Sequence, residues 1–248
     1  MLKKERQTHI LHRVNVHNRV LSLDLSHEMQ VSEDTIRRDL NELAGQGRII
    51  KVHGGALSKS FHSSLQPTDV YSQDKKKIIG KKAAGLIHDG MFVLTTGGTT
   101  IIELARLLPE HLRATFITGS LPAALEYIQH PNIEVIFIGD KISRNSQITV
   151  GGEAIWKIRQ IKADICFLGI NAMDVSHGIT DSDWEVVQVK KAMIESSEKV
   201  VALSISEKID TVQKILVCGL KKIDLLVTEL PAEDAKLIPY RSAGIQVL

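Results

Sequence analysis

The stretch VSEDTIRRDLNEL at residues 31–43 decides how the first sixty residues of this chain fold. Ser32 is suited to N-cap a helix, and the two acidic residues after it fall in the first turn, where the helix dipole favours negative charge. Ile36, Leu40 and Leu43 then recur at helical spacing and form one apolar stripe. The stretch therefore predicts an amphipathic helix that buries this stripe.

Two shorter helical patterns precede this helix. Apolar residues share one face of a helix that begins near Lys3, and they recur every four residues between positions 21 and 29. We expect a break between the two at 15–19 and a tight turn at 30–31. The third helix is expected over 33–44. Three helices with a short turn between the last two predict a helix-turn-helix, whose third helix enters the major groove of DNA.

A hairpin is expected directly after the third helix. Gly45 and Gly47 end the helix, and RIIKVHGGAL at residues 48–57 is typical of a short strand, a glycine turn and a second strand. Such a hairpin is the wing of a winged helix-turn-helix.

The side chains that the third helix turns away from its apolar stripe could contact DNA. They are Thr35, Arg37, Arg38 and Asn41. Arginine can bind guanine with two hydrogen bonds or hold a phosphate, and asparagine can read adenine. The alternative is a small helical domain whose arginines are only solvated. The complete order of helices, turn, arginines and hairpin favours DNA binding.

Charge is distributed unevenly along the chain. Residues 1–60 carry ten Lys and Arg against seven Asp and Glu, a net charge of +3, whereas the other 188 residues carry 21 against 22. Half of the ten histidines also lie in the first sixty residues. This mild asymmetry suits a DNA-binding head.

Composition excludes several other classes of protein. The hydrophobic content of 43% and charged content of 24% are those of a globular protein, and 4% aromatics argue against a base-stacking surface for single strands. No apolar run approaches the ~20 residues that span a bilayer, and the charged N-terminus is unlike a signal peptide. Cys166 and Cys218 sit in apolar runs, and the histidines lack the spacing of metal ligands. We expect a cytoplasmic protein with buried thiols, no metal, no cofactor and no membrane partner.

The rest of the chain reads as a linker and one α/β domain. Residues 58–74 are serine-rich and contain Pro67, which is typical of a linker. The expected domains are therefore 1–57 for DNA binding and 75–248 for effector binding and oligomerisation. The larger domain alternates helices, expected at 75–88, 100–108, 122–129, 153–161 and 184–196, with strands, expected at 91–95, 114–118, 134–139, 165–170, 200–204 and 225–228. This alternation predicts a largely parallel sheet covered on both faces, which binds ligands at the carboxyl ends of its strands.

One strand end has the composition of a phosphate site. The strand at 91–95 leads through TTGGTT at 95–100 into a helix. Glycines let the backbone approach a ligand, and free amides at a helix start, with threonine hydroxyls beside them, suit a phosphate. The alternative is a simple strand-to-helix turn with threonine as its N-cap. Small polar groups at two further strand ends, Thr118-Gly119-Ser120 and Gly151-Gly152, favour the phosphate site.

The head resembles that of the DeoR-type regulators of sugar operons. VSEDTIRRDL at 31–40 and HGGA at 53–56 match that family's V-S-x-x-T-I-R-R-D-L and H-G-G-A signature. The resemblance implies that the third helix contacts DNA and that the HGG segment forms the wing tip. Asp39 is expected to orient an arginine, because phosphates repel a carboxylate. The candidate DNA-binding residues are Ser32, Thr35, Arg37, Arg38, Asn41, Arg48, Lys51, His53, Gly54 and Gly55.

The resemblance continues from about Lys76 to Leu248, through Gly98-Thr99-Thr100, Gly178-Ile179-Thr180 and KKAMI at 190–194. It implies a sensor domain similar in fold to ribose-5-phosphate isomerase, and a phosphorylated sugar or related metabolite as its effector. It also implies a repressor of a carbohydrate-metabolism operon. That repressor is expected to bind double-stranded operator DNA as a homo-oligomer, either a dimer or a tetramer. The candidate effector-binding residues are Thr96, Gly97, Gly98, Thr99, Thr100, Thr118, Ser120, Gly169, Asn171, Glu185 and Lys208.

The chain departs from the family pattern at three places near this site. The family has Asp where Thr96 stands, Thr-Asn-Ser where Thr118-Gly119-Ser120 stands, and an Asp before a Ser-Lys pair where this chain reads SISEK at 204–208. A lost carboxylate and a lost amide remove groups that would hold sugar hydroxyls. The effector is therefore expected to be less hydroxylated, or differently shaped.

Two other functions compete with this interpretation. A sugar-phosphate isomerase fused to a DNA-binding head would need a carboxylate base for enolisation. The isomerases have Asp-Gly-Ala-Asp at a strand end, whereas the nearest match here is LGIN at 168–171, which leaves only Glu185 and Asp174 as conceivable bases. An architectural DNA binder without a ligand is disfavoured by the glycine-threonine loop. We therefore expect a regulator that is not an enzyme.

Overall fold

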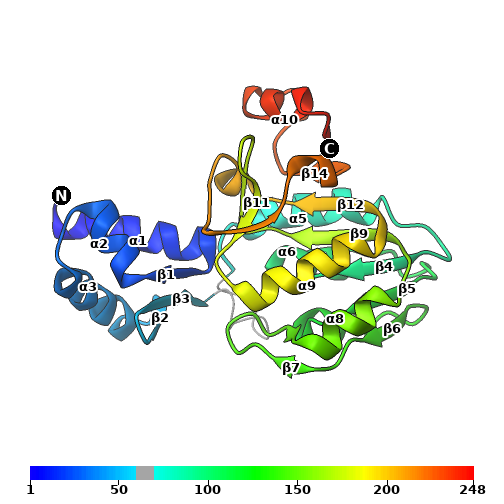
Figure 1. The fold of residues 1–248 in the computed structure, drawn as a ribbon, viewed down its shortest axis with the longest axis horizontal. Helices are drawn as coiled ribbons and strands as arrows, with labels where there is room; N and C mark the ends of the chain where they lie inside the picture. Colours follow the sequence, from blue (N-terminus) through cyan, green and yellow to red (C-terminus); the bar gives the residue numbers. More distant parts are fainter. Residues whose placement is uncertain (60–69) are drawn as a thin grey trace. The chain divides into compact units, whose positions relative to one another are not determined.

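The chain folds into two compact units, Met1–Tyr71 and Ser72–Leu248, in a computed structural model that describes residues 1–59 and 70–248 (Figure 1). Of the linker expected at 58–74, residues 60–69 lie outside this described part. Each unit has its own hydrophobic core.

The first unit is a winged helix-turn-helix, as expected. Its helices are α1 (Lys3–His17), α2 (Ser22–Met29) and α3 (Glu33–Gly45), and its wing is the hairpin of β2 (Ile49–Val52) and β3 (Gly55–Ser58). The predicted stripe of Ile36, Leu40 and Leu43 is fully buried in the core of this unit.

The break expected at 15–19 differs in detail from the structure. Helix α1 continues to His17, and β1 (Arg19–Leu21) then pairs antiparallel with β3 to give a sheet of order β1-β3-β2. A strand of three residues is too short to show the alternation of apolar and polar residues that identifies strands in sequence.

The second unit is built on a seven-stranded sheet of order β15-β14-β12-β9-β4-β5-β6, in which every neighbouring pair is parallel. The strands are β4 (Phe92–Thr95), β5 (Thr115–Thr118), β6 (Glu134–Phe137), β9 (Ala163–Gly169), β12 (Ser197–Leu203), β14 (Leu225–Val227) and β15 (Gln246–Val247). The expected parallel sheet is therefore confirmed.

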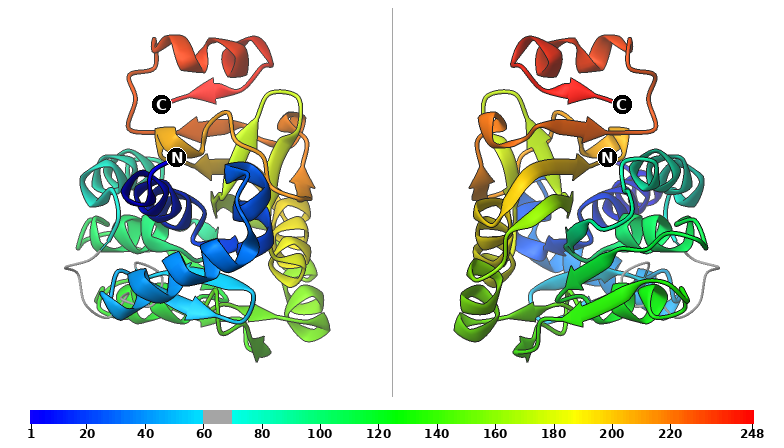
Figure 2. Two further views of the ribbon diagram at one scale, coloured as in Figure 1. Left: turned by 90° about the vertical axis from the view of Figure 1, so that its left-hand side faces the viewer. Right: turned by 90° about the vertical axis from the view of Figure 1, so that its right-hand side faces the viewer.

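Helices cover both faces of this sheet (Figure 2). One layer contains α5 (Gln73–Ala84), α6 (Thr99–Arg106) and α7 (Leu121–Tyr127), and the other contains α8 (Gly152–Arg159) and α9 (Trp184–Glu195). The short helix α10 (Ile238–Ser242) precedes the last strand. Because the sheet is parallel, the ends of β4, β5, β9 and β12 lie at one edge, where α/β sheets bind ligands.

Short antiparallel elements surround the carboxyl ends of the strands and were not expected from sequence. They are the sheet of β10 (Ala172–Asp174), β11 (Gly178–Asp181) and β13 (Ile215–Cys218), and the hairpin of β7 (Lys141–Ile142) and β8 (Thr149–Val150). Three 3₁₀ turns, η2 (Ser206–Lys208), η3 (Leu220–Lys222) and η4 (Ala235–Leu237), complete the unit. Among the described residues, no helix combines the length and the apolar character that crossing a membrane requires.

Candidate DNA-binding surface and candidate effector site

Helix α3 begins at the predicted cap. The backbone N–H of Thr35 donates to Ser32 Oγ (3.3 Å), and the two hydroxyls lie 2.9 Å apart. Arg37, Arg38 and Asn41 are exposed on this helix, and the guanidinium of Arg37 pairs with Glu33 (3.0 Å) within its own helix. An exposed ion pair of this kind is worth only ~0–1 kcal/mol, so a DNA phosphate can replace the carboxylate.

Asp39 does bind an arginine, and that arginine belongs to α1. The carboxylate is 2% exposed, and its Oδ2 lies 2.5 Å from Nε of Arg6. Gln7 donates a weaker hydrogen bond to the other oxygen (3.4 Å). The pair therefore fixes α3 against α1.

A side-chain hydrogen bond joins the wing to α3, beside the packing of Ile49 in their shared core. Lys51 Nζ on β2 donates to Asn41 Oδ1 (2.5 Å), while Arg48 and His53 are exposed. Gly54 has a φ of +73°, which favours glycine in the turn.

Gly55, which was expected at the wing tip, is the second constrained glycine of this turn. It is buried, and a Cβ at this position would overlap the carbonyl oxygen of Val20 on β1. The glycine therefore lets β1 pack against β3.

The start of α6, in the predicted glycine-threonine loop, has no capping side chain. Its N-cap is Gly98, with a φ of +109°, and its first turn contains no acidic residue. Residues 97–100 are partly exposed. An uncapped helix start presents free backbone amides and a positive dipole end to an anion.

Three other helices of this unit have a side-chain acceptor at their start, unlike α6. Ser120 accepts from the backbone of α7, Asp183 accepts from two amides of α9, and Asp140 Oδ2 accepts from the N–H of Ala154 in α8 (2.9 Å). The Gly151-Gly152 end, which the sequence suggested as a further polar group for the ligand, is thus occupied by a carboxylate.

Thr96 and Gly169 shape the loop from behind. Thr96 is buried, and its Oγ1 accepts from the N–H of Gly169 (2.8 Å), which ties the end of β4 to the end of β9. A Cβ at Gly169 would lie 2.8 Å from the carbonyl oxygen of Gly97. The two residues lie at the expected place, and their contacts hold the backbone.

Thr118 and Ser120 are also buried, with their hydroxyls already engaged. Thr118 Oγ1 donates to Thr95 O (2.9 Å) and accepts from the N–H of Ser120 (3.1 Å). Hairpin β7–β8 fills the neighbouring space, because a Cβ at Gly97 would lie 2.6 Å from Ile148 Cγ2 and one at Gly119 would overlap Thr149 Oγ1. An asparagine at position 119 would need this hairpin to move.

A buried ion pair lies beside Gly169 at the end of β9. Lys190 Nζ lies 2.8 Å from Asp181 Oδ2 and donates to Gly169 O (2.9 Å), and Asn171 Nδ2 donates to Asp181 Oδ1 (2.8 Å). Burial alone would raise the pKa of Asp181, but the charge and hydrogen bond of Lys190, with the Asn171 bond, lower it overall. Asp181 is therefore ionised and fully engaged.

Two further lysines adjoin this pair, Lys76, which is buried, and Lys208, which is partly exposed. Lys208 Nζ donates to Ile170 O (2.8 Å). Burial and the positive charges of Lys76 and Lys190 lower the pKa of Lys208 to about 7. Burial also lowers the pKa of Lys76 to about 8, against the opposing effect of Glu207 and Glu103.

Of these lysines, only Lys208 was a candidate from sequence. Lys76 could have been found, because it shares the face of α5 that buries Ile79, Gly80 and Ala83, where a lysine is unusual. Glu185, by contrast, lies outside this cluster of contacts: it is half exposed and pairs with Lys141 of β7 (2.9 Å).

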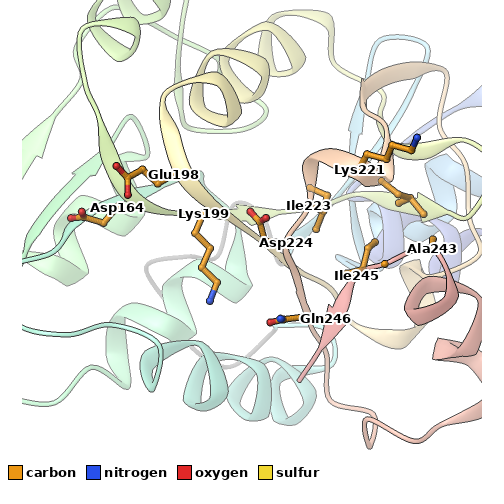
Figure 3. A pocket seen from close by; sticks show the side chains of 11 residues that line it. Asp164, Glu198, Lys199, Lys221, Ile223, Asp224, Ala243, Ile245 and Gln246 are labelled. Atoms are coloured by element: carbon orange, nitrogen blue, oxygen red, sulfur yellow. The ribbon is translucent and has the colours of Figure 1, made fainter.

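A cavity of about 730 Å³ lies at the amino ends of the strands (Figure 3). Its two strand-end carboxylates are already bound to backbone amides, Asp164 to Phe92 N and Asp224 to Val200 N, each at 2.7 Å. It lies at the opposite end of the strands from the glycine-threonine loop, and its carboxylates are unsuited to an anion. Its lining residues include Asp164, Glu198, Lys199, Lys221, Ile223, Asp224, Ala243, Ile245 and Gln246.

Known proteins resemble this chain along its whole length. Residues 6–61 match the DeoR-like helix-turn-helix domain, and residues 71–230 match the DeoR C terminal sensor domain. The HTH-type transcriptional repressor GlcR of Bacillus subtilis is 33% identical over 255 residues, which cover 100% of this chain and 96% of GlcR. The HTH-type transcriptional regulator GolR of Listeria innocua is 30% identical over 250 residues, covering 100% and 98%.

A solved structure of ribose 5-phosphate isomerase A from Methanocaldococcus jannaschii is also similar, with a TM-score of 0.42, 19% identity, and coverage of 56% of this chain and 55% of that one. The sensor-domain match covers well over half of the chain, and the helix-turn-helix match accounts for the first unit. The chain belongs to the DeoR family of helix-turn-helix transcription regulators.

Proposed function

We propose that this regulator represses a carbohydrate-metabolism operon and that a phosphorylated sugar or related metabolite, bound at the start of α6, controls its affinity for operator DNA. The observation that carries the effector part is the uncapped start of α6 beside the lysines Lys76 and Lys208. The relatives named as a repressor and a regulator support the DNA-binding part.

The charges around α6 favour an anionic ligand. Lys190 is balanced by Asp181, whereas the described hydrogen bond of Lys208 goes to a neutral carbonyl. Asp181 and Glu207 offset part of the positive charge around Lys208, but burial and the charges of Lys76 and Lys190 still lower its pKa, so an anion that reaches Lys208 would stabilise its charged form. A phosphate monoester carries about −1.5 to −2 charges at neutral pH, which suits this excess.

Contacts between α5 and α6 support a place for Lys76 beside the phosphate. Gln73 Nε2 donates to Glu103 Oε1 (3.4 Å), and a Cβ at Gly80 would lie 2.9 Å from the backbone of Glu103. The two helices thus pack closely, with the first turn of α5 beside α6. Lys76 lies between these two contact points on the buried face of α5.

The proposed DNA contact uses α3 and the wing. The arginines of α3 would hold phosphates and read base edges, and the lysine and arginine of β2 would hold phosphates. A symmetric dimer, or a tetramer made of dimers, would place two α3 helices on repeated half-sites.

An isomerase activity is the less supported alternative. The one buried carboxylate near Gly169 is Asp181, which is held by Lys190 and Asn171 and has no free basic oxygen for proton abstraction. Asp174 accepts from the backbone of residues 176 and 177 and from the His177 ring, within its own turn. We therefore propose regulation without sugar-phosphate isomerisation.

A thermal-shift screen tests the effector proposal. Phosphorylated sugars and their unphosphorylated counterparts are compared on the full chain and on Thr99→Ala, which removes a hydroxyl from the first turn of α6. A ligand at ~100 times its Kd adds about 2.7 kcal/mol of stability. We expect phosphorylated compounds alone to raise Tm, and Thr99→Ala to reduce the shift. Equal shifts from unphosphorylated sugars would contradict the proposal.

A further inference from the structure

Two consecutive residues of α5 face two consecutive residues of the 3₁₀ turn η2. Lys75 and Lys76 lie on α5, and Glu207 and Lys208 lie on η2. The pair of Lys75 and Glu207 is oppositely charged and in contact, with Nζ 2.7 Å from Oε1. The pair of Lys76 and Lys208 is of like charge, with Lys76 buried and Lys208 partly exposed.

The attractive pair belongs to a larger polar network. Lys75 Nζ also lies 3.2 Å from Ser206 Oγ and 3.3 Å from Glu229 Oε1. Both oxygens of Glu229 accept from the backbone N–H of Ser206, at 3.1 and 3.0 Å, and Lys236 Nζ donates to Ser206 O (2.7 Å). The network therefore fixes η2 through its first residue and joins it to α5.

The charges in this network are maintained at neutral pH. Burial acts to lower the pKa of Lys75, but hydrogen bonds and charge from Glu207 and Glu229 outweigh it and raise the pKa overall. Burial acts to raise the pKa of Glu229, and its hydrogen bonds with Ser206 outweigh burial and lower it. Both glutamates are mostly buried, with side chains 21% and 8% exposed, so water screens their attraction to Lys75 less than at an open surface.

The repulsive pair depends on the attractive one for its position. Lys76 and Lys208 each follow a residue of the network, so the network sets how far apart the two cations lie. The two lysines repel each other, the charges of Glu207, Glu103 and Asp181 offset part of that repulsion, and the attraction of Lys75 for Glu207 and Glu229 opposes the rest. An anion that contacts both lysines would remove the repulsion and draw α5 and η2 together.

The first turn of α5 is also where the chain enters the sensor unit. Helix α5 begins two residues after the first unit ends at Tyr71, and its N-cap, Ser72, has a φ of +52° and forms no side-chain cap. Ser72 Oγ instead donates to Glu207 Oε1 (3.5 Å). The same carboxylate thus holds both the entry point of the chain and Lys75.

We propose that Lys75, Glu207 and Glu229 form a clamp that positions Lys76 and Lys208 for the phosphate of the effector and passes its occupancy to Ser72 and the first turn of α5, where the chain enters the sensor unit. This proposal rests on the proposed phosphate site at the start of α6. The three clamp residues are positioning residues, since they act on the ligand through their neighbours.

The test uses inorganic phosphate as the probe and the full chain throughout. Lys75→Met breaks the clamp, Lys75→Arg keeps its charge, and Glu229→Gln weakens it from the other side. Arg159→Met is the matched control, because it breaks an exposed ion pair with Glu195 (3.3 Å) in the same unit. Calorimetry gives the Kd for phosphate, and fluorescence anisotropy gives the Kd for an operator duplex selected from a random pool, with and without phosphate.

We expect Lys75→Met and Glu229→Gln to weaken phosphate binding about tenfold, which is a loss within the range of ordinary allosteric coupling. We also expect both variants to reduce the effect of phosphate on DNA affinity. DNA affinity without phosphate should stay within about twofold of the parent chain. Lys75→Arg should restore phosphate binding, and Arg159→Met should change neither Kd. A merely structural role would lower Tm without changing the ratio of DNA affinities.

Two results would overturn the clamp, and only the second would also overturn the proposed phosphate site. If the parent chain binds phosphate while Lys75→Met and Glu229→Gln bind it equally well and respond equally on DNA, the clamp is wrong and the phosphate site stands. If the parent chain binds neither phosphate nor any phosphorylated sugar, the proposed site and the clamp are both wrong. Because the two clamp variants alter different elements, one that fails to fold leaves the other to decide.

Discussion

Replacing Lys190 by methionine should destabilise the sensor unit by more than lost packing explains. The Lys190 and Asp181 side chains are 6% and 2% exposed and lie 2.8 Å apart. Removing one partner of a buried ion pair costs about 3–5 kcal/mol, because the other charge stays buried without compensation. The lost hydrogen bond to Gly169 O adds roughly 0.5–1.5 kcal/mol. We expect Lys190→Met to lower the free energy of unfolding by about 4–6 kcal/mol.

A double-mutant cycle separates this explanation from simple loss of contacts. Asp181→Asn alone should cost about 3–5 kcal/mol, because it strands the lysine charge. The double variant strands neither charge, so its loss should fall short of the sum of the two single losses by about 2 kcal/mol or more. Urea unfolding followed by tryptophan fluorescence reports the sensor unit alone, since both tryptophans, Trp156 and Trp184, lie in it.

The control for this cycle is Arg159→Met, which should change the free energy of unfolding by no more than about 0.5 kcal/mol. A loss below ~1 kcal/mol for Lys190→Met, or single losses that simply add in the double variant, would refute the account of a buried and mutually dependent ion pair.

Three further predictions concern other parts of the chain. Arg37→Ala should weaken operator binding by about 1–3 kcal/mol in anisotropy measurements at fixed salt, and unchanged affinity would remove α3 as the recognition helix. Gly55→Ala should unfold the first unit, seen as lost helical circular dichroism with the tryptophan signal retained, because its Cβ would overlap the Val20 carbonyl; a stable, DNA-binding variant would contradict this. Burial and neighbouring lysines lower the pKa of Lys208 from 10.5 to about 7. Between these two pH values the unfolded chain binds more protons than the folded chain, so the free energy of unfolding should increase as pH rises through this range. Urea unfolding at about pH 6 and about pH 9 should show this rise, Lys208→Met should reduce it, and an equal rise in that variant would exclude Lys208 as its source.

The first unit was predictable because its sequence signals are local. The stripe of Ile36, Leu40 and Leu43, the Ser32 cap and the glycine turn each lie within a few residues of the element that they specify, and the structure has all three. Strand β1 was missed because it contains three residues and exists only through its pairing with β3. The need for glycine at position 55 also arises from that pairing.

The architecture of the sensor unit was predictable from sequence, but the side-chain contacts at the candidate effector site were less so. Alternating helices and strands predicted the parallel sheet and the place of the glycine-threonine loop. Ser120 could have been recognised as an N-cap, because its partner lies only three residues away, but sequence could not show that the Thr118 hydroxyl donates to the backbone of β4, because that partner lies on another strand. The buried lysines were hidden for the same reason, since a charged residue is expected at the surface until its tertiary partners are known.

The most direct test of the central claim is the operator affinity of the full chain, measured by anisotropy with and without the phosphorylated compound that gives the largest thermal shift. The account predicts that the compound lowers DNA affinity by roughly 5- to 150-fold, that its unphosphorylated counterpart does not, and that Thr99→Ala binds DNA normally but responds less. An operator affinity that no phosphorylated compound changes, or a response that Thr99→Ala retains in full, would contradict it.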